Sequence, residues 1–197
     1  MQGFYVPVLI LLLVGCSLPL SAPPADTTHT LALAPDTPVP RAMPAGVTLQ
    51  VAAPSAAPGY ATSAMAYRQS PHELLYYARH RWVDRPARLL GQALEDGLSL
   101  AGVSVLAEGA GARPDYRLLS ELLQLEQDFT QRPSRVRLAL RLQLVDVRLA
   151  RVLGNHTVRL EQPAVSDDAP GGVVAANALL ATAVAETAAF CGRLTGD

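Results

Sequence analysis

Every second residue from 136 to 144 is a large apolar one, and this pattern restricts the fold more than any other part of the sequence. The apolar residues are Val136, Leu138, Leu140, Leu142 and Leu144, and those between them are Arg135, Arg137, Ala139, Arg141 and Gln143. A period of two residues is that of a β-strand with one face in a core and the other in water. We therefore predict a half-buried strand whose arginines are exposed.

The end of this strand predicts an irregular hairpin. After Leu144 the apolar phase shifts by one residue, which predicts a β-bulge at Leu144-Val145. The Leu-Gly-Asn sequence at residues 153–155 is typical of a hairpin turn and leads into a second strand over residues 156–160. Because such a hairpin needs further strands beside it, we interpret residues 115–130 as a strand, although their leucines would also suit a helix.

The rest of the chain is predicted to supply shorter strands and two helices. Extended segments are predicted at residues 30–33, 47–53, 64–68, 74–83 and 103–106. A helix is predicted from Asp84, a suitable N-cap, through Pro86 in the first turn to Gly102, because apolar residues recur there at helical spacing. A long Ala-rich helix follows residue 172. The predicted fold is a single α+β domain, an antiparallel or mixed sheet with two helices packed on it in an α/β sandwich.

The last helix determines our interpretation of one of the two cysteines. Its predicted apolar stripe is Val173, Ala176, Leu180, Val184, Thr187, Cys191 and Leu194. Because Cys191 lies on that stripe, we predict a buried thiol that packs as a small hydrophobic residue. A reactive thiol is the alternative, since the other cysteine has a different predicted role.

That second cysteine ends an apolar run at the start of the chain. The run begins at Phe4, and its last four residues, Leu13-Val14-Gly15-Cys16, resemble the lipobox of bacterial lipoproteins, in which the cysteine thiol is acylated. The run is typical of a signal-peptide core, because a membrane-spanning helix needs about 20 residues. We therefore predict lipidation at Cys16; the alternative is a signal anchor with an incidental cysteine.

The lipobox resemblance divides the chain into three parts. We predict a signal peptide over residues 1–15, a lipidated N-terminus and Pro-containing tether over 16–28, and the α+β domain over 29–197. Several acyl chains anchor a protein firmly, because each buried methylene contributes about 0.8 kcal/mol. Ser17 follows the cysteine, and by analogy with well-studied Gram-negative lipoproteins it favours the periplasmic face of the outer membrane over the inner membrane.

Charge and motif content exclude several function classes. The net charge is −1 and the isoelectric point is near 6.4, so the chain lacks the basic character of nucleic-acid-binding proteins. The four histidines are scattered without metal-ligand spacing, no serine lies in a G-x-S-x-G motif, and no glycine pattern suits a phosphate. Glu126 and Asp128 form a candidate carboxylate pair, which we interpret as a solvated face. We predict no catalytic residue, no metal and no cofactor.

Three aromatic side chains, Tyr76, Tyr77 and Trp82, lie close together in a chain that is only 5% aromatic. In a regular strand Tyr76 and Trp82 would share one face and Tyr77 would lie on the other. Two interpretations remain open, because aromatic residues dominate cores and are also enriched at binding surfaces. We predict that these three residues include contacts to a partner protein or to a lipid.

Four segments resemble the family of ABC-type transport auxiliary lipoproteins, also described as PqiC-like. They are LQVAAPSAAPGY at residues 49–60, AYRQ at 66–69, LLYYARHRWVDRPARLL at 74–90 and DYRLLSELLQLEQDF at 115–129. The third segment is the most specific. The order of lipobox, tether, aromatic strand, helix, hairpins and Ala-rich helix is also similar to that of the family, and the resemblance covers roughly residues 47–190.

The resemblance implies a non-enzymatic lipoprotein of a lipid-transport system in the cell envelope. Its implied partners are a substrate-binding protein with an MCE domain, an inner-membrane permease and an ATPase. The lipoprotein would dock the periplasmic assembly to the outer membrane, as a homo-oligomeric ring. The alternative is an outer-membrane scaffold lipoprotein that binds cell-wall or secretion-machinery proteins.

Overall fold

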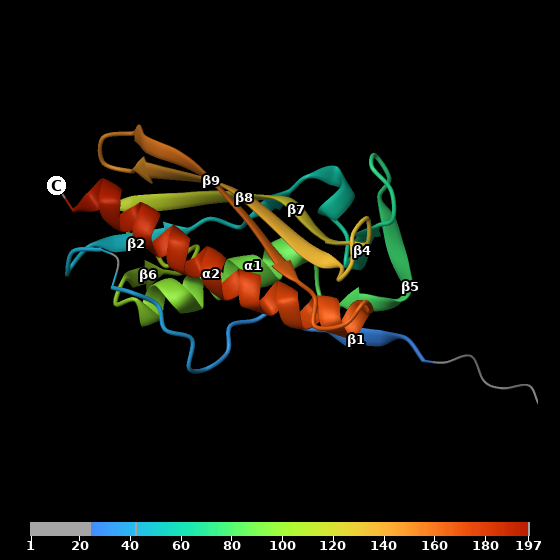
Figure 1. Ribbon diagram of the computed structural model, residues 1–197. Helices are drawn as coiled ribbons and strands as arrows, with labels where there is room; N and C mark the ends of the chain where they lie inside the picture. Colours follow the sequence, from blue (N-terminus) through green and yellow to red (C-terminus); the bar gives the residue numbers. More distant parts are fainter. Residues whose placement is uncertain (1–24, 42, 197) are drawn as a thin grey trace, which may run out of the picture.

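The computed structural model describes residues 25–41 and 43–196, which form one curled sheet and two α-helices (Figure 1). In chain order the elements are β1 (Thr27–His29), β2 (Thr48–Val51), β3 (Ser55–Ala56), the 3-10 helix η1 (Pro58–Tyr60), β4 (Ala64–Arg68), β5 (Leu75–Trp82), α1 (Pro86–Leu100), β6 (Ser104–Leu106), β7 (Tyr116–Asp128), β8 (Arg135–Asp146), β9 (Arg151–Pro163) and α2 (Ala169–Thr195). The predicted single α+β domain is confirmed, and so is the strand over most of residues 115–130.

β7 is the central strand of the sheet and is paired along both of its edges. Along one edge it pairs in parallel with β2 near its start, with β3 in the middle and with β4 near its end. Along the other edge it pairs antiparallel with β8, which in turn pairs antiparallel with β9. β5 and β1 extend the sheet beyond β4, and β6 extends it beyond β2. The sheet is therefore mixed.

The two helices pack against one another and cover the face of the sheet that carries the alternating leucines of β8 (Figure 1). Leu140, Leu142 and Leu144 are completely buried there, and burying each such side chain stabilises the fold by roughly 1.5–3 kcal/mol. At the helix contact, a Cβ atom on Gly97 of α1 would lie 2.2 Å from the Val184 side chain of α2. Glycine therefore allows the close approach of the helices.

α2 is long and apolar enough to cross a membrane by length and composition alone, with a mean hydropathy of 1.6 over its most apolar window. Half of that window is buried inside the domain. Ala176, Leu180, Val184, Thr187 and Cys191 of the predicted stripe are all buried. The helix is therefore a core element, and the predicted burial of Cys191 is confirmed.

The first strand lies earlier than predicted. β1 covers Thr27–His29, across the predicted boundary between tether and domain at residues 28 and 29, whereas residues 30–33 are not a strand. The side-chain amide of Asn177 on α2 explains the difference: it donates to the carbonyl of Thr30 (3.2 Å) and accepts from the amide of Ala32 (2.8 Å). A helix side chain thus replaces the neighbouring strand that this segment would need.

The predicted start of α1 was wrong by one residue. Arg85 is the N-cap and makes no side-chain capping bond, while Pro86 occupies the first turn as predicted. The carboxylate of Asp84 accepts instead from the amide of Arg85 (2.7 Å) and lies 3.2 Å from the guanidinium of Arg88. Asp84 therefore stabilises the start of the helix through an ion pair one turn along.

The hairpin turn also lies earlier than predicted. The register does shift at Leu144-Val145, but the extra residue is on β9, and residues 153–155 belong to that strand. Asp146 starts the turn instead, because its carboxylate accepts from the amides of Arg148 and Leu149 (2.9 Å each). Gly154 serves packing, since a Cβ atom there would lie 2.9 Å from the Leu194 side chain of α2.

Candidate functional site

The aromatic strand β5 lies between β4 and β1 and is irregular. Ala64 pairs with Arg81 and Ala66 with Tyr76, so β5 advances by five residues where β4 advances by two. This irregularity interrupts the alternation of side chains along β5. The prediction that Tyr76 and Trp82 share a face is therefore wrong, and the three aromatic side chains have three different environments.

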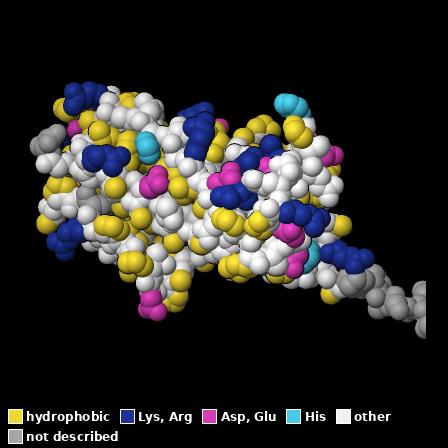
Figure 2. All heavy atoms as spheres, viewed as in Figure 1, with side chains coloured by type: hydrophobic (Ala, Val, Ile, Leu, Met, Phe, Trp, Pro, Cys, Tyr) yellow, Lys and Arg dark blue, Asp and Glu magenta, His cyan; other side chains and the backbone are white. Residues whose placement is uncertain are grey.

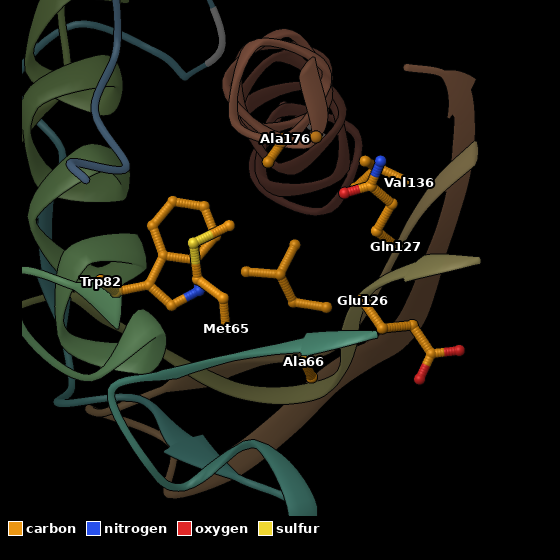
Figure 3. Close-up of a pocket in the computed structure, with 9 residues that line it drawn as sticks. Met65, Ala66, Trp82, Glu126, Gln127, Val136 and Ala176 are labelled. Carbon is orange, nitrogen blue, oxygen red and sulfur yellow. The ribbon is translucent and has the colours of Figure 1, made fainter. Parts of the chain in front are cut away.

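Trp82 is a core residue, with 5% of its surface exposed. Its ring lies beside Met65 and beneath Ala176 of α2, at a cavity of about 10 Å³ that Leu125 and Val136 also line (Figure 3). A cavity of this size holds about one water molecule. The space beside Trp82 is therefore too small for a lipid chain.

Tyr77 is half-buried and joins β5 to a hydrogen-bonded chain beneath α2. Its hydroxyl donates to the side-chain oxygen of Gln127 (2.8 Å), and the Gln127 amide donates to the hydroxyl of Ser134 (2.9 Å). Gly172 makes room for this amide, because a Cβ atom there would lie 2.2 Å from the Gln127 oxygen. Burial, and then the nearby charge of Asp168, raise the pKa of Tyr77, which keeps it a neutral donor.

Tyr76 is the most exposed of the three aromatic residues, at 42%. Its hydroxyl donates to the carbonyl of Gly59 (2.8 Å), so the ring lies over the short helix η1. It is the one member of the predicted set whose position suits direct contact with a partner. Partner or lipid contact by Tyr76, Tyr77 and Trp82 stays a prediction.

Glu126 was predicted to be solvated, and this is wrong. It is buried on the face of the sheet opposite the helices, and Figure 3 shows its carboxylate pointing away from Trp82 and α2. The carboxylate accepts from the hydroxyl of Tyr60 (2.5 Å) and from the side-chain amide of Gln124 (2.9 Å), and it forms an ion pair with Arg68. Burial and this hydrogen bond raise the pKa of Tyr60.

Asp128 follows Glu126 on the same face and is also buried, again contrary to prediction. It lies 2.6 Å from Arg137 in an ion pair without a well-directed hydrogen bond on that oxygen, and its other oxygen accepts from the amide of Thr130 (2.8 Å). Burial alone would raise the pKa of Asp128, but the Thr130 hydrogen bonds and the charges of Arg137 and Arg68 lower it. Each carboxylate thus has its own arginine, which is the arrangement of a structural ion pair.

These two pairs are part of a larger charged surface, the helix-free face of the sheet. Its ion pairs are Arg68–Glu126, Arg137–Asp128, Arg135–Glu161, Arg137–Glu161 and Arg141–Glu121. The sequence predicted arginines on this face but not their partners. Four of the five pairs join β8 to its neighbours in the chain, β7 and β9, whereas Arg68–Glu126 joins β7 to the distant strand β4.

A histidine pair that the sequence did not predict connects β1 to β5. Nε2 of His29 lies 3.0 Å from Nδ1 of His80, and the two rings are stacked with centroids 5.2 Å apart. Burial, and then the charge of His80, lower the pKa of His29. Within residues 25–41 and 43–196, no group of three His, Cys, Asp or Glu side chains could hold a metal ion.

Of the two cysteines, Cys191 lies within the described structure and Cys16 lies outside it. Burial raises the pKa of the Cys191 thiol to about 12, as expected for an unreactive side chain in an apolar core. Cys16, the predicted lipidation site, lies outside the described residues. Its lipidation therefore stays a prediction from the sequence.

The fold and its sites define the class of the protein: an α+β domain whose mixed sheet is covered by two helices on one face and carries ion-paired side chains on the other. The sequence matches the family described as the ABC-type transport auxiliary lipoprotein component over residues 29–188. The chain belongs to this family, so the predicted membership is confirmed. Its members are auxiliary lipoproteins of ABC-type transport systems, located at a membrane of the cell envelope.

Solved structures agree in fold. A protein from Xanthomonas campestris is 22% identical, with a TM-score of 0.70 and coverage of 86% of this chain and 94% of that one. An uncharacterized protein is 16% identical, with a TM-score of 0.64 and coverage of 86% and 98%. A hypothetical protein from Chlamydia trachomatis is 11% identical, with a TM-score of 0.51 and coverage of 78% and 100%. No curated protein matches the sequence.

Proposed function

We propose that this chain is a non-enzymatic component of an MCE-type ABC transport system that moves lipid across the cell envelope. In this proposal Cys16 carries the lipid anchor, and the domain docks the periplasmic assembly to the outer membrane. Its partners are the MCE-domain substrate-binding protein, the permease and the ATPase. The family match over residues 29–188 is the observation that carries the proposal.

The described sites support binding over catalysis. Glu126 is neutralised by Arg68, and Asp128 by Arg137, so the carboxylates are engaged in holding strands together. The cavity beside Trp82 has about 10 Å³, far below the roughly 300–1,000 Å³ of typical ligand pockets, and the wider recess of about 440 Å³ between residues 30–37 and α2 has no charged side chain in its lining. A protein that positions other components needs a stable scaffold and an exposed surface, and it needs neither a reactive group nor a lipid cavity.

The anchor is tested by replacing Cys16 with Ser and separating membranes from soluble protein. We expect the wild type in the outer-membrane fraction, labelled by radioactive fatty acid, and the variant in the soluble periplasmic fraction without label. Cys191→Ser is the matched control, which should keep both label and location. Retention of unlabelled Cys16→Ser protein in washed membranes would contradict lipidation and indicate a signal anchor.

The partners are tested by co-purification of the tagged wild-type protein from detergent-solubilised envelopes. We expect the MCE-domain protein of the same system to be recovered with it. Recovery of cell-wall or secretion-machinery proteins without any transport component would contradict the proposal and favour the scaffold alternative. The predicted homo-oligomeric ring is tested on the purified protein by sedimentation-velocity ultracentrifugation, where a single monomeric species at micromolar concentration would contradict it.

A further inference from the structure

The turn that joins β8 to β9 is held rigidly by side chains around it. The Asp146 carboxylate accepts from the amides of Arg148 and Leu149 (2.9 Å each), and Arg113 donates to the carbonyl of Val147 (2.8 Å). Ala150 completes the turn with a φ of +48°, in the left-handed region. A turn fixed in this way loses little conformational entropy when it binds a partner.

This rigid turn presents apolar side chains to solvent between arginines. Leu149 is 64% exposed and Val152 is 45% exposed. Arg148 and Arg151 flank Leu149 in sequence and are both exposed. We call this surface the hairpin tip; it consists of residues 147–152 together with Arg113 and Arg193.

The arginines outnumber the acids at this end of the molecule. Arg193 belongs to the last turn of α2, which reaches the hairpin through the packing of Leu194 on Gly154. Two carboxylates lie at this end among the described residues. That of Asp146 accepts from the backbone amides of the turn, and that of Asp115 accepts from Thr48 and lies 4.0 Å from Arg148. Figure 2 shows basic groups next to hydrophobic side chains at the end where Figure 1 places this turn. The hairpin tip is therefore a cationic surface with an apolar centre.

The hairpin tip also lies at the opposite end of the domain from the predicted anchor. The tether enters the domain at β1, which pairs with the last residues of β5, and Arg81 of β5 lies opposite Ala64 at the start of β4, two residues before the pairing of Ala66 with Glu126 on β7. The hairpin tip lies at the first residue of β7, where Tyr116 pairs with Asp146, and Figure 1 shows β1 and this turn at opposite ends of the domain. Along β7 the two levels are separated by about 26 Å, at about 3.3 Å per residue. An anchored molecule thus has its hairpin tip free to face the periplasm.

We propose that the hairpin tip is a docking surface for a protein that offers an apolar recess with an acidic rim. Leu149 and Val152 would enter the recess, and Arg148 and Arg151 would pair with rim carboxylates. A single exposed leucine is not evidence for a binding surface. Here, however, Leu149 and Val152 lie on a rigid turn, next to arginines, at the end of the domain opposite the predicted anchor. The inference rests on the proposed function, in which the occupant is the MCE-domain protein of the transport system.

The experiment measures binding of the purified full-length mature protein, in detergent, to the purified MCE-domain protein by surface plasmon resonance. The tip variants are the double reversal Arg148→Glu/Arg151→Glu and the single change Leu149→Ser. The matched controls are Arg85→Glu/Arg159→Glu, two exposed arginines outside β5 and the hairpin tip, and Val165→Ser, whose side chain is 70% exposed. Circular dichroism melts confirm that every variant is folded.

We expect each tip variant to bind at least tenfold more weakly, because central interface residues dominate affinity, while the controls bind like the wild type. Wild-type binding should also weaken with added salt, since the arginines are screened. Unchanged affinity of both tip variants, or an equal loss in the controls, would overturn the inference and leave the proposed function standing.

Two further outcomes separate the remaining possibilities. If the wild type does not bind the MCE-domain protein, the proposed function fails and the inference fails with it. The other outcome comes from measuring the binding of the wild type and the tip variants to vesicles of phosphatidylglycerol and phosphatidylethanolamine. If the wild type binds them and the tip variants do not, while binding to the MCE-domain protein is unchanged, the occupant is a membrane and the inference is overturned.

Discussion

The two faces of β8 show two different ways of stabilising the same strand. On the helix-covered face, Leu140 and Leu142 are completely buried among apolar side chains. On the helix-free face, Arg137 and Arg141 form ion pairs with acids of β7 and β9. Burial of apolar surface is non-directional, whereas an ion pair depends on the position of one partner. The free energy of unfolding should therefore depend on side-chain volume at the helix-covered face and on side-chain charge at the helix-free face.

The largest effect is expected on the helix-covered face. Replacing Leu142 with Ala removes a side chain with no exposed surface and leaves a cavity between the sheet and the helices. The free energy of unfolding should fall by about 3 kcal/mol, within the range for buried leucines. Urea denaturation of the soluble domain measures this change, and a loss below about 1 kcal/mol would show that the core can close around the missing atoms.

The second effect tests whether the helix-free face also contains a buried interior. Replacing Glu126 with Ala leaves the Tyr60 hydroxyl and the Arg68 guanidinium without their shared acceptor. We expect a loss of about 2–3 kcal/mol, because breaking a buried ion pair leaves an uncompensated group. Glu126→Gln is the matched control, which keeps the shape and an acceptor for Tyr60 and should lose less. Equal losses in the two variants would show that charge is unimportant at this position.

The third prediction is that the stability contributed by the helix-free face depends on pH, whereas that of the helix-covered face does not. The pKa of Asp128 is lowered in the folded state, so its contribution to stability is present above its ordinary pKa and is lost as the pH falls through the folded value. Stability should therefore decline as the pH falls below 4, with a smaller decline in Asp128→Asn. Leu142→Ala should shift the whole profile without changing its slope. Parallel profiles for the wild type and Asp128→Asn would contradict this assignment.

The sequence could predict one face of this sheet and not the other. A period of two along residues 136–144 shows which side chains enter the core, and all the predicted positions are buried. The same pattern shows arginines without their partners. Glu126 meets Arg68 through the parallel pairing of β4 with β7, and no local pattern contains that pairing. For this reason Glu126 was predicted to be solvated and is buried, while Asp128, also predicted to be solvated, is buried against Arg137 of the next strand.

Local irregularities are the second reason why the sequence could not predict parts of the structure. The irregularity in β5 separates Tyr76 from Trp82, and a regular alternation could not predict it. The hairpin turn was predicted at a glycine, but Gly154 accommodates Leu194, and the turn forms where Asp146 binds two amides. In β5 the pairing with β4 decides the local structure, whereas at the hairpin the signal is local, because Asp146 accepts from amides two and three residues ahead. The hairpin tip was missed because its exposed Leu149 continues an apolar pattern.

The smallest effect is expected one residue from the largest. Arg141 precedes Leu142 on β8 and points to the opposite face, where its side chain is 57% exposed and lies 2.5 Å from Glu121. Replacing Arg141 with Ala should change the free energy of unfolding by no more than about 0.5–1 kcal/mol, because an exposed ion pair is screened and restricts two long side chains. Glu121→Ala and the double variant complete a thermodynamic cycle, in which the coupling energy should be small and should fall further in 1 M salt. A coupling above about 2 kcal/mol would mean that Arg141 and Glu121 belong to the buried network of Glu126, and the exposed part of the helix-free face would then be smaller than the side-chain exposures indicate.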